Sequence, residues 1–227
     1  MNDSRKLEQF TRDRGATVFG VANLERLRKN APEFEYQPVP KNMQRAVVIG
    51  MRLQDAVVDE LVDRPTPLYF HMYRQANYAL DRVAFELTLQ IQNQGGKAIA
   101  VPASQVVERN PMRGAISHRL LGWDAGIGWI GRSTLLVHPQ FGSRMRYASV
   151  LTDLDLPAGQ PMDKGCGSCL RCVDACPAKA ICKDSRDFDL DSCYGKLDQF
   201  RKIPYVGQHI CGICVRACGG PDWPHSS

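Results

Sequence analysis

The sequence predicts an α/β domain followed by a small cysteine-rich module. Residues 1–160 contain no cysteine and alternate between helix-like and strand-like hydrophobic patterns. All nine cysteines lie between Cys166 and Cys218, and a segment rich in proline and glycine, residues 157–165, separates the two parts. We therefore expect one domain over residues 1–160 and a second over residues 161–227, since the chain is long enough for both.

The first part begins with a helix and two strands. Residues 4–14 are expected to form the helix and residues 16–24 the first strand. The unbroken apolar run at residues 46–53 is typical of a strand buried on both faces. From residue 69 to 94, apolar residues recur every three or four positions, which predicts a long helix that Gly95 ends.

The remaining elements of the first part are shorter. We expect a strand at residues 97–104 and a short helix at residues 115–121. Two further apolar segments, residues 133–139 and 144–154, are expected to pair with each other as strands. Strands interleaved with helices indicate an α/β layer architecture.

The cysteines follow the spacing of bacterial iron–sulfur proteins. The first run is C-x2-C-x2-C-x3-C-P, formed by Cys166, Cys169, Cys172 and Cys176. The second group is Cys193, Cys211, Cys214 and Cys218. In two-cluster ferredoxins the fourth cysteine of each run binds the other cluster. We therefore expect a ferredoxin-like module with two [4Fe-4S] clusters, one on Cys166, Cys169, Cys172 and Cys218, and the other on Cys176, Cys193, Cys211 and Cys214.

These cysteines have two alternative uses, a disulfide framework and a zinc site. A disulfide framework suits small secreted proteins, but the N-terminus is polar and has no apolar leader. Zinc accepts C-x2-C spacings, although it requires neither the proline-terminated run nor an interlocked second group. The ninth cysteine, Cys182, is expected to be a free thiol rather than a ligand or nucleophile.

Charge and hydropathy limit the partners and the compartment. The net charge of +5 comes from scattered Lys and Arg, which is weak evidence for nucleic acid or for an acidic redox partner. No window of 18 apolar residues exists, so we expect no membrane span. Reduced thiols without a leader predict a cytoplasmic protein, and exposed clusters favour an anaerobic setting.

A glycine motif precedes the last strands of the first part. Gly126, Gly128 and Gly131 match G-x-G-x-x-G, but no strand precedes the motif and no helix follows, so it is not a dinucleotide fingerprint. It is either a tight turn or a glycine-lined loop that a bulky ligand can approach. In the second case the cofactor-binding residues are Gly126, Gly128, Trp129, Gly131, Arg132 and Ser133.

The chain resembles a known family from about Glu108 to Cys218. The segment AGIGWIGRSTLLVHPQFGSRMRYASVLTDLDL, the run CGSCLRCVDACPAKAI and the isolated Cys193 are similar to the epoxyqueuosine reductases and the related reductive dehalogenases. The resemblance implies an α+β flavin-reductase-like sandwich that holds cobalamin beside a cluster. It also implies that electrons pass through both clusters to cobalt.

The chain departs from that family at several places. Pro102 stands about where the family has an acidic proton donor, and the segment between Arg109 and Gly126 is longer. The helical-repeat domain that family members use on tRNA does not follow Cys218, so tRNA is not expected as a partner. No D-x-H-x-x-G motif occurs, so a bound cobalamin would lack a lower-ligand histidine.

Few other polar residues are candidates for catalysis. His118 is a candidate proton donor or, alternatively, a histidine on a helix surface. Tyr73 is the second candidate, although it and Tyr78 also suit a core or rim position on the long helix. Glu108 and Arg109 either pair with each other or line the pocket. His209 is expected to tune or shield a cluster rather than to bind it.

Together these features predict an iron–sulfur oxidoreductase that is corrinoid-dependent and reduces a small-molecule substrate. Its electrons would come from an external donor such as a ferredoxin or a flavodoxin. Two alternatives stay open at this point: a non-catalytic electron-transfer protein, and an accessory protein that reduces or handles corrinoids.

Overall fold

The computed structural model describes residues 3–109 and 112–220. The chain forms two compact units, each assembled from separate segments. The first unit contains the residues up to 51, 76–128 and 146–163, and the second contains residues 52–75, 129–145 and the cysteine-rich part from 164 onward. The second unit thus includes two segments from the first 160 residues. The domain boundary near residue 160 stays a prediction.

A four-stranded sheet forms the centre of the first unit. Its order is β1 (Val18–Asn23), β2 (Arg45–Arg52), β8 (Met145–Thr152) and β3 (Ala98–Val101). β1 pairs antiparallel with β2, placing Val21 opposite Val47, and β3 pairs antiparallel with β8, placing Ala100 opposite Val150. Five consecutive residues of β2 are buried, as the apolar run at 46–53 predicts. The mixed α/β class is confirmed.

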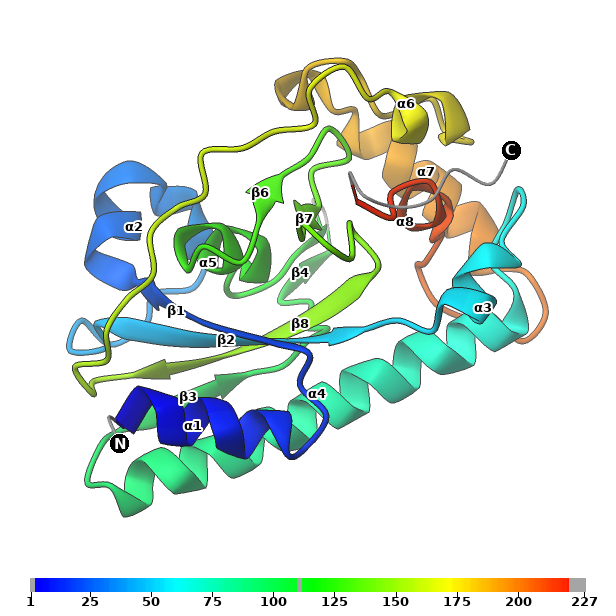
Figure 1. The fold of residues 1–227 in the computed structure, drawn as a ribbon. Helices are drawn as coiled ribbons and strands as arrows, with labels where there is room; N and C mark the ends of the chain where they lie inside the picture. The colour runs from blue at the N-terminus through cyan, green and yellow to red at the C-terminus, as the bar shows by residue number, and fades with distance from the viewer. Residues whose placement is uncertain (1–2, 110–111, 221–227) are drawn as a thin grey trace. The chain divides into compact units, whose positions relative to one another are not determined.

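Helices cover both faces of this sheet (Figure 1). α1 (Asp3–Arg12) and the later part of α4 (Pro67–Asn93) lie on one face, and α2 (Leu24–Asn30) and α5 (His118–Asp124) lie on the other. The apolar positions of α4 pack into the core against the sheet; they include Leu80, Val83, Ala84, Leu87 and Ile91. Because these residues recur every three or four positions, they lie on one face of the helix and are buried together.

Two helix boundaries follow from their end residues. Gly95 adopts a φ of +83°, the left-handed conformation that favours glycine after a helix, which confirms the predicted end of α4. α5 begins later than expected, at His118, because the Ser117 side chain accepts a hydrogen bond from the Leu120 amide and caps the helix. The helix then continues to Asp124, beyond the expected end at residue 121.

The expected pairing of residues 133–139 with residues 144–154 is wrong. β7 (Leu136–Val137) pairs instead with β6 (Trp129–Ile130), whereas β8 lies inside the four-stranded sheet. Seven of the eight β8 residues are buried, so the strand packs between two neighbours. Local hydrophobicity identifies a strand but not its partner, because pairing depends on residues distant in sequence. A third, two-stranded sheet joins β4 (Glu108–Arg109) to β5 (Met112–Arg113).

The second unit has short helices and a core that includes cysteines. Its helices are α3 (Asp55–Asp59), the start of α4, α6 (Arg171–Ala175), α7 (Leu190–Phe200) and α8 (Ile213–Arg216), and single 3-10 turns occur in the chain at Pro32–Phe34 and Ser185–Asp187. α8 packs against both α6 and α3. Cys172, Cys176, Ala180 and Ile181 form a buried cluster. No described helix has the length and apolar character needed to cross a membrane.

Candidate functional site

All nine cysteines are free thiols and lie in the second unit. Burial is the main cause that raises the pKa of Cys172 to about 11, and nearby cysteines contribute to the same shift. Those neighbours are Cys218, Cys166 and Cys169. They are the partners that the sequence assigns to Cys172.

The second group is built in the same way. Burial raises the pKa of Cys211 to about 11, with further contributions from Cys193 and Cys176. Burial also raises the pKa of Cys214 well above its usual value, and the contributing neighbours are Cys211, Cys193, Cys172 and Cys176. Cys172 links the two groups, because it contributes to the raised pKa of Cys214 although it belongs to the first expected ligand set.

Thiolate sulfur is a ligand both for single metal ions and for iron–sulfur clusters. Buried thiolates repel one another, and a bound cation relieves that cost because metal ligation requires deprotonated sulfur. Within residues 3–109 and 112–220, however, no three His, Cys, Asp or Glu side chains surround a point that would hold a metal ion. Zinc needs four ligands at about 2.3 Å.

Short helices and turns place the thiols. Cys172 lies on α6, Cys193 on α7 and Cys214 on α8. α7 is capped by the Asp189 side chain, which accepts a hydrogen bond from the Ser192 amide at 2.9 Å. α8 follows Gly212, whose φ is +86° and whose missing Cβ would meet the Tyr69 ring.

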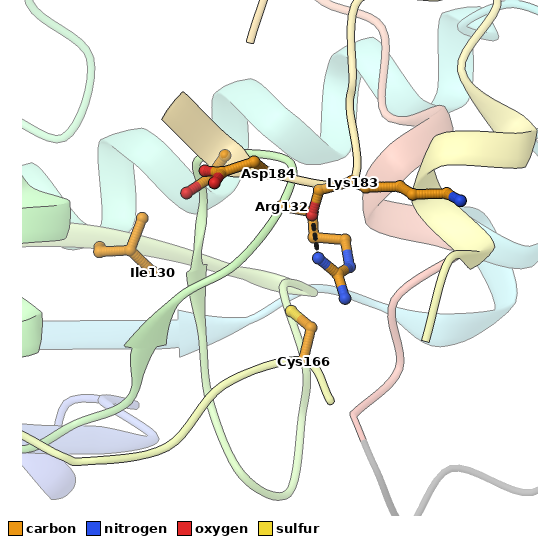
Figure 2. A pocket seen from close by; sticks show the side chains of 6 residues that line it. Ile130, Arg132, Cys166, Lys183 and Asp184 are labelled. Carbon is orange, nitrogen blue, oxygen red and sulfur yellow. Dashed lines mark hydrogen bonds between the residues drawn. The ribbon is translucent and has the colours of Figure 1, made fainter. Parts of the chain in front are cut away.

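Arg132 binds the backbone of the first cysteine loop. Its guanidinium donates hydrogen bonds to the carbonyl oxygens of Gly167, Cys169 and Lys183, with 2.9 Å between Nε and the Cys169 oxygen. Figure 2 shows the bond to Lys183 and the Cys166 side chain nearby. Arginine suits this role because its donors form a fixed planar fork. Arg132 therefore has a structural role in this loop in addition to its expected contact with a ligand.

A polar pocket of about 390 Å³ lies beside Cys166 (Figure 2). Its lining consists of Ile130, Arg132, Cys166, Lys183, Asp184 and Ser185. Hydrogen bonds from the Arg186 side chain and backbone hold the pKa of Asp184 at about 2, so its carboxylate is charged at neutral pH. The pocket therefore contains charges of both signs next to a candidate cluster ligand.

The loop after β7 supports Cys218. Gly142 adopts a φ of +58°, and a Cβ at this position would collide with the Cys218 carbonyl. The Ser143 amide donates to the same carbonyl at 3.0 Å. Next to it, the buried Arg144 lies 3.2 Å from Asp55 and 2.8 Å from Asp59. Sequence reasoning missed Arg144, because its carboxylate partners lie more than 80 residues away and no local motif marks them.

The glycine motif is largely occupied by contacts within the protein. Gly126 has a φ of +76°, and its missing Cβ would lie 2.6 Å from the Gln160 carbonyl oxygen. A Cβ on Gly131 would meet Val137 at 2.7 Å and the Cys166 sulfur at 3.4 Å. α5 precedes the motif and β6 follows, which agrees with the exclusion of a dinucleotide fingerprint.

Three other members of the predicted ligand loop are buried. Gly128 is buried, and Trp129 and Ser133 are each 5% exposed. The Trp129 Nε1 is buried and has no hydrogen-bond partner among the described residues. An indole N–H normally finds a partner when it is buried. Trp129 is therefore the loop residue that is best suited to meet a ligand.

His118 is a half-buried residue of the first unit that is held in one tautomer. Its Nε2 lies 2.8 Å from the Pro102 carbonyl oxygen and its Nδ1 lies 2.8 Å from the Ser149 Oγ. A carbonyl only accepts, so Nε2 donates and Nδ1 accepts from the serine hydroxyl. Burial is the main cause that lowers the pKa of His118 to about 4. The ring is neutral at pH 7 and holds no imidazolium proton to give.

The other polar candidates are dispersed. Tyr73 is half-buried on the part of α4 in the second unit, whereas Tyr78 is 61% exposed on the part in the first unit. Glu108 accepts a hydrogen bond from the Tyr36 hydroxyl, and the side chain of Arg109 lies outside the described residues. His209 stacks on Tyr194 with 5.0 Å between ring centroids. The structure does not gather these residues into one constellation, and their roles stay predictions.

Comparison with known sequences gives partial matches. No protein-family model matches the chain. An epoxyqueuosine reductase from Lactococcus garvieae is 45% identical over 103 residues, which cover 41% of this chain and 29% of that protein. A tetrachloroethene reductive dehalogenase from Desulfitobacterium hafniense is 37% identical over 103 residues, 43% of this chain and 19% of that protein. The matches thus span less than a third of these curated relatives.

Solved structures show the same fold. An epoxyqueuosine reductase from Streptococcus thermophilus has a TM-score of 0.62 at 21% identity, covering 96% of this chain and 66% of that one. A catabolic reductive dehalogenase in complex with 3-bromo-4-hydroxybenzoic acid has a TM-score of 0.70 at 17% identity, covering 93% and 31%. At these identities the likeness shows the fold alone.

Two further structures bear on ligands. One reductive dehalogenase, studied for B12-dependent dehalogenation, has a TM-score of 0.64 at 19% identity, covering 78% of this chain and 25% of that one. One epoxyqueuosine reductase that holds a tRNA stem loop has a TM-score of 0.52 at 20% identity, covering 78% and 52%. By sequence and by fold, this chain therefore has homologues among the epoxyqueuosine reductases and the reductive dehalogenases, which it matches over part of their length.

Proposed function

We propose that the chain is an iron–sulfur oxidoreductase whose second unit binds two [4Fe-4S] clusters. The observation that supports this proposal is that Cys172 has Cys166, Cys169 and Cys218 as neighbours, while Cys211 has Cys176 and Cys193. One expected ligand set is Cys166, Cys169, Cys172 and Cys218, and the other is Cys176, Cys193, Cys211 and Cys214. The reductase names of the sequence relatives support the class of reaction.

The residues around the thiols have distinct tasks. A bound pair of clusters supplies one-electron carriers. Arg132 keeps the loop from Gly167 to Cys169 in position through its three carbonyl contacts. The loop at Gly142 and Ser143 does the same for Cys218. The polar pocket beside Cys166 leaves this side open to a small substrate or reductant.

Metal analysis tests the cluster proposal. Anaerobically reconstituted protein is expected to contain about eight iron and eight sulfide per chain. The control variant Cys182→Ser is expected to keep the full content, because Cys182 belongs to neither thiol group. Four irons per chain would contradict the second cluster, and stoichiometric zinc would contradict both.

The corrinoid is the finer part of the proposal. Its support is the fold shared with a dehalogenase studied for B12-dependent chemistry, together with the unpartnered Nε1 of Trp129. Three residues of the loop support a corrinoid site less. The space beside Gly126 and Gly131 is filled by other residues, and Arg132 donates its hydrogen bonds to backbone carbonyls. Trp129 and Gly128 are therefore the residues that we assign to a corrinoid, and Ser133 the polar neighbour.

A spectroscopic titration tests the corrinoid separately. Anaerobic addition of cobalamin is expected to shift the visible spectrum towards the base-off form, because the chain has no lower-ligand motif. Gly128→Val is expected to abolish the shift while iron content stays constant. If cobalamin changes nothing, or if a flavin co-purifies, the corrinoid proposal fails and an electron-transfer protein becomes the better description.

A tRNA substrate is a second candidate. The solved reductase with a tRNA stem loop favours it, which weakens the expectation that tRNA is not a partner. The net charge of +5 is compatible with a polyanion. Salt-dependent binding of an anticodon stem loop by the full chain would support tRNA, and no binding at low salt would exclude it.

A further inference from the structure

The first cysteine loop contains a cation that bonds directly to one of its thiols. Arg171, on α6, donates a hydrogen bond from Nε to the Sγ of Cys169 at 3.5 Å. Its backbone amide forms a further hydrogen bond to the same thiol. Its Nη2 donates to the Gly220 carbonyl oxygen at 3.1 Å, two residues after Cys218. One side chain thus contacts the surroundings of two cysteines of the first expected ligand set.

Two guanidinium groups are held against Cys169. Among the nine cysteines, which all lie in the described part of the chain, Cys169 is the exposed one. Arg132 donates from Nε to the Cys169 carbonyl oxygen at 2.9 Å, while Arg171 donates to the sulfur. Partial burial raises the pKa of Cys169, but the Arg171 hydrogen bond and the charges of both arginines lower it overall. The charged groups that act on this thiol therefore favour its anionic form.

Carboxylates do not take up the charge of Arg171. In the part of the chain that the structure describes, Arg171 forms no ion pair with Asp174 on the same helix or with any other carboxylate. Asp184 interacts electrostatically with Arg132, but it accepts hydrogen bonds from the Nε of Arg186 at 3.0 Å and 3.1 Å. The printed partners of the Arg171 side chain are thus a thiol and a neutral carbonyl.

The second expected ligand set has a different balance of charge. Asp189 acts electrostatically on Cys193 and Lys196 acts on Cys211, so a negative and a positive charge offset each other. Among the described residues, neither of these side chains hydrogen-bonds to a thiol. The positive charge with a direct bond to a thiol therefore belongs to the first set, at Cys169.

We propose that Arg171 raises the reduction potential of the first cluster and makes it the more easily reduced of the two. This inference rests on the proposed function, because it requires both clusters to be bound. Reduction adds a negative charge to a cluster whose thiolate ligands are already anionic. A cation that hydrogen-bonds to a ligand sulfur stabilises this reduced form.

The consequence is a direction for electron transfer between the clusters. The second cluster is oxidised by one electron, the first is reduced by one, and no bond forms or breaks. Arg171 acts through Cys169, so its effect is on the potential of the cluster and not on a substrate.

A potentiometric titration of the full chain tests the order of the two potentials. Dithionite is the reductant, and electron paramagnetic resonance follows the reduced clusters after anaerobic reconstitution. The signal that appears at the higher potential should be the one that is missing from Cys218→Ala, because Cys218 belongs to the first expected ligand set. If Cys218→Ala removes the signal of lower potential instead, the proposal is wrong.

Two substitutions of Arg171 separate its charge from its packing. Arg171→Gln removes the charge and keeps a hydrogen-bond donor. It should make reduction of the first cluster about tenfold less favourable, a fall of about 59 mV in midpoint potential, and leave the second cluster unchanged. Arg171→Lys keeps the charge and should retain most of the potential. An unchanged first potential in Arg171→Gln would contradict the proposal.

The matched control is Arg64→Gln, the same charge change elsewhere in the second unit, where Arg64 is 63% exposed and pairs with Asp63. It should leave both potentials unchanged, and equal shifts by Arg64→Gln and Arg171→Gln would overturn the proposal. Iron and sulfide analysis identifies a structural role. If Arg171→Gln and Arg171→Lys both lose the first cluster, Arg171 supports the loop and does not set the potential. If the unmodified chain binds no cluster, the proposed function itself fails, and this inference fails with it.

Discussion

At the scale of single residues, His118 and Arg132 show how position changes the role of a side chain. Both are chemically versatile, and both were candidates for contact with a substrate or cofactor. In the structure both bind backbone carbonyls, His118 that of Pro102 and Arg132 those of the first cysteine loop. Carbonyl acceptors are present at every residue, so the sequence does not mark which of them a side chain will meet.

The low pKa of His118 predicts a pH-dependent stability. Its pKa is about 4 in the folded chain and 6.5 in the absence of structure. As pH falls from 6.5 to 4, the unfolded chain binds a proton that the folded chain does not, so stability falls with pH. Because the ring is half-buried, we discount the full shift and expect a loss on the order of 2 kcal/mol.

Chemical denaturation of the wild-type chain and of His118→Gln at pH 5 and pH 7.5 measures this loss. Glutamine can keep both hydrogen bonds but does not titrate. The variant is therefore expected to lose less stability between the two pH values, while acid lability of any cluster affects both proteins alike. Parallel pH profiles would show that His118 does not titrate as expected.

At the scale of elements, one buried ion pair joins β1, α2 and α5 in the first unit. Asp124, at the end of α5, is fully buried and accepts from the Asn23 amide at 2.6 Å. Arg26 on α2 donates to the same carboxylate at 2.6 Å and 2.8 Å, and also to the Gly159 carbonyl at 2.8 Å. The pair therefore also holds the segment that follows β8.

Asp124→Asn is expected to destabilise the chain by about 3 kcal/mol. The substitution keeps the shape of the side chain but leaves the Arg26 guanidinium without its counter-charge in a partly buried site. Denaturant midpoints measure the change. The matched control is Asp63→Asn, whose partner Arg64 is 63% exposed and whose effect should be much smaller, because solvent screens an exposed pair. Equal effects of the two substitutions would mean that the buried pair contributes no more than the surface pair.

At the scale of the whole molecule, the cysteine module is built with segments far apart in the chain. The second unit combines residues 52–75 and 129–145 with the part from 164 onward. Arg132 reaches the first cysteine loop, Gly142 makes room for Cys218, and the ring of Tyr69 packs where Gly212 has no side chain. The thiol groups therefore depend on residues that the simple boundary near residue 160 assigns elsewhere.

The cross-ligation between the two cysteine runs is testable in the whole chain. Cys218→Ala is expected to damage the cluster of the first set and to halve the iron content to about four per chain. The second set, with Cys193, Cys211 and Cys214, should stay intact. Electron paramagnetic resonance spectra of the reduced protein can separate the two, with Cys182→Ser as the control. Loss of the second cluster first would show that the assignment of Cys218 is wrong.

The sequence alone determined the features that depend on nearby residues. Helical periodicity placed α4 and an unbroken apolar run placed β2. The spacing of the cysteines predicted two ligand sets, which stay a prediction. Tertiary structure alone decided the features that join distant segments: the pairing of β7 with β6, the position of β8, and the ion pair of Asp124 with Arg26. The physical reason is that local patterns report propensity and burial, whereas pairing and buried charge depend on which distant groups folding brings together.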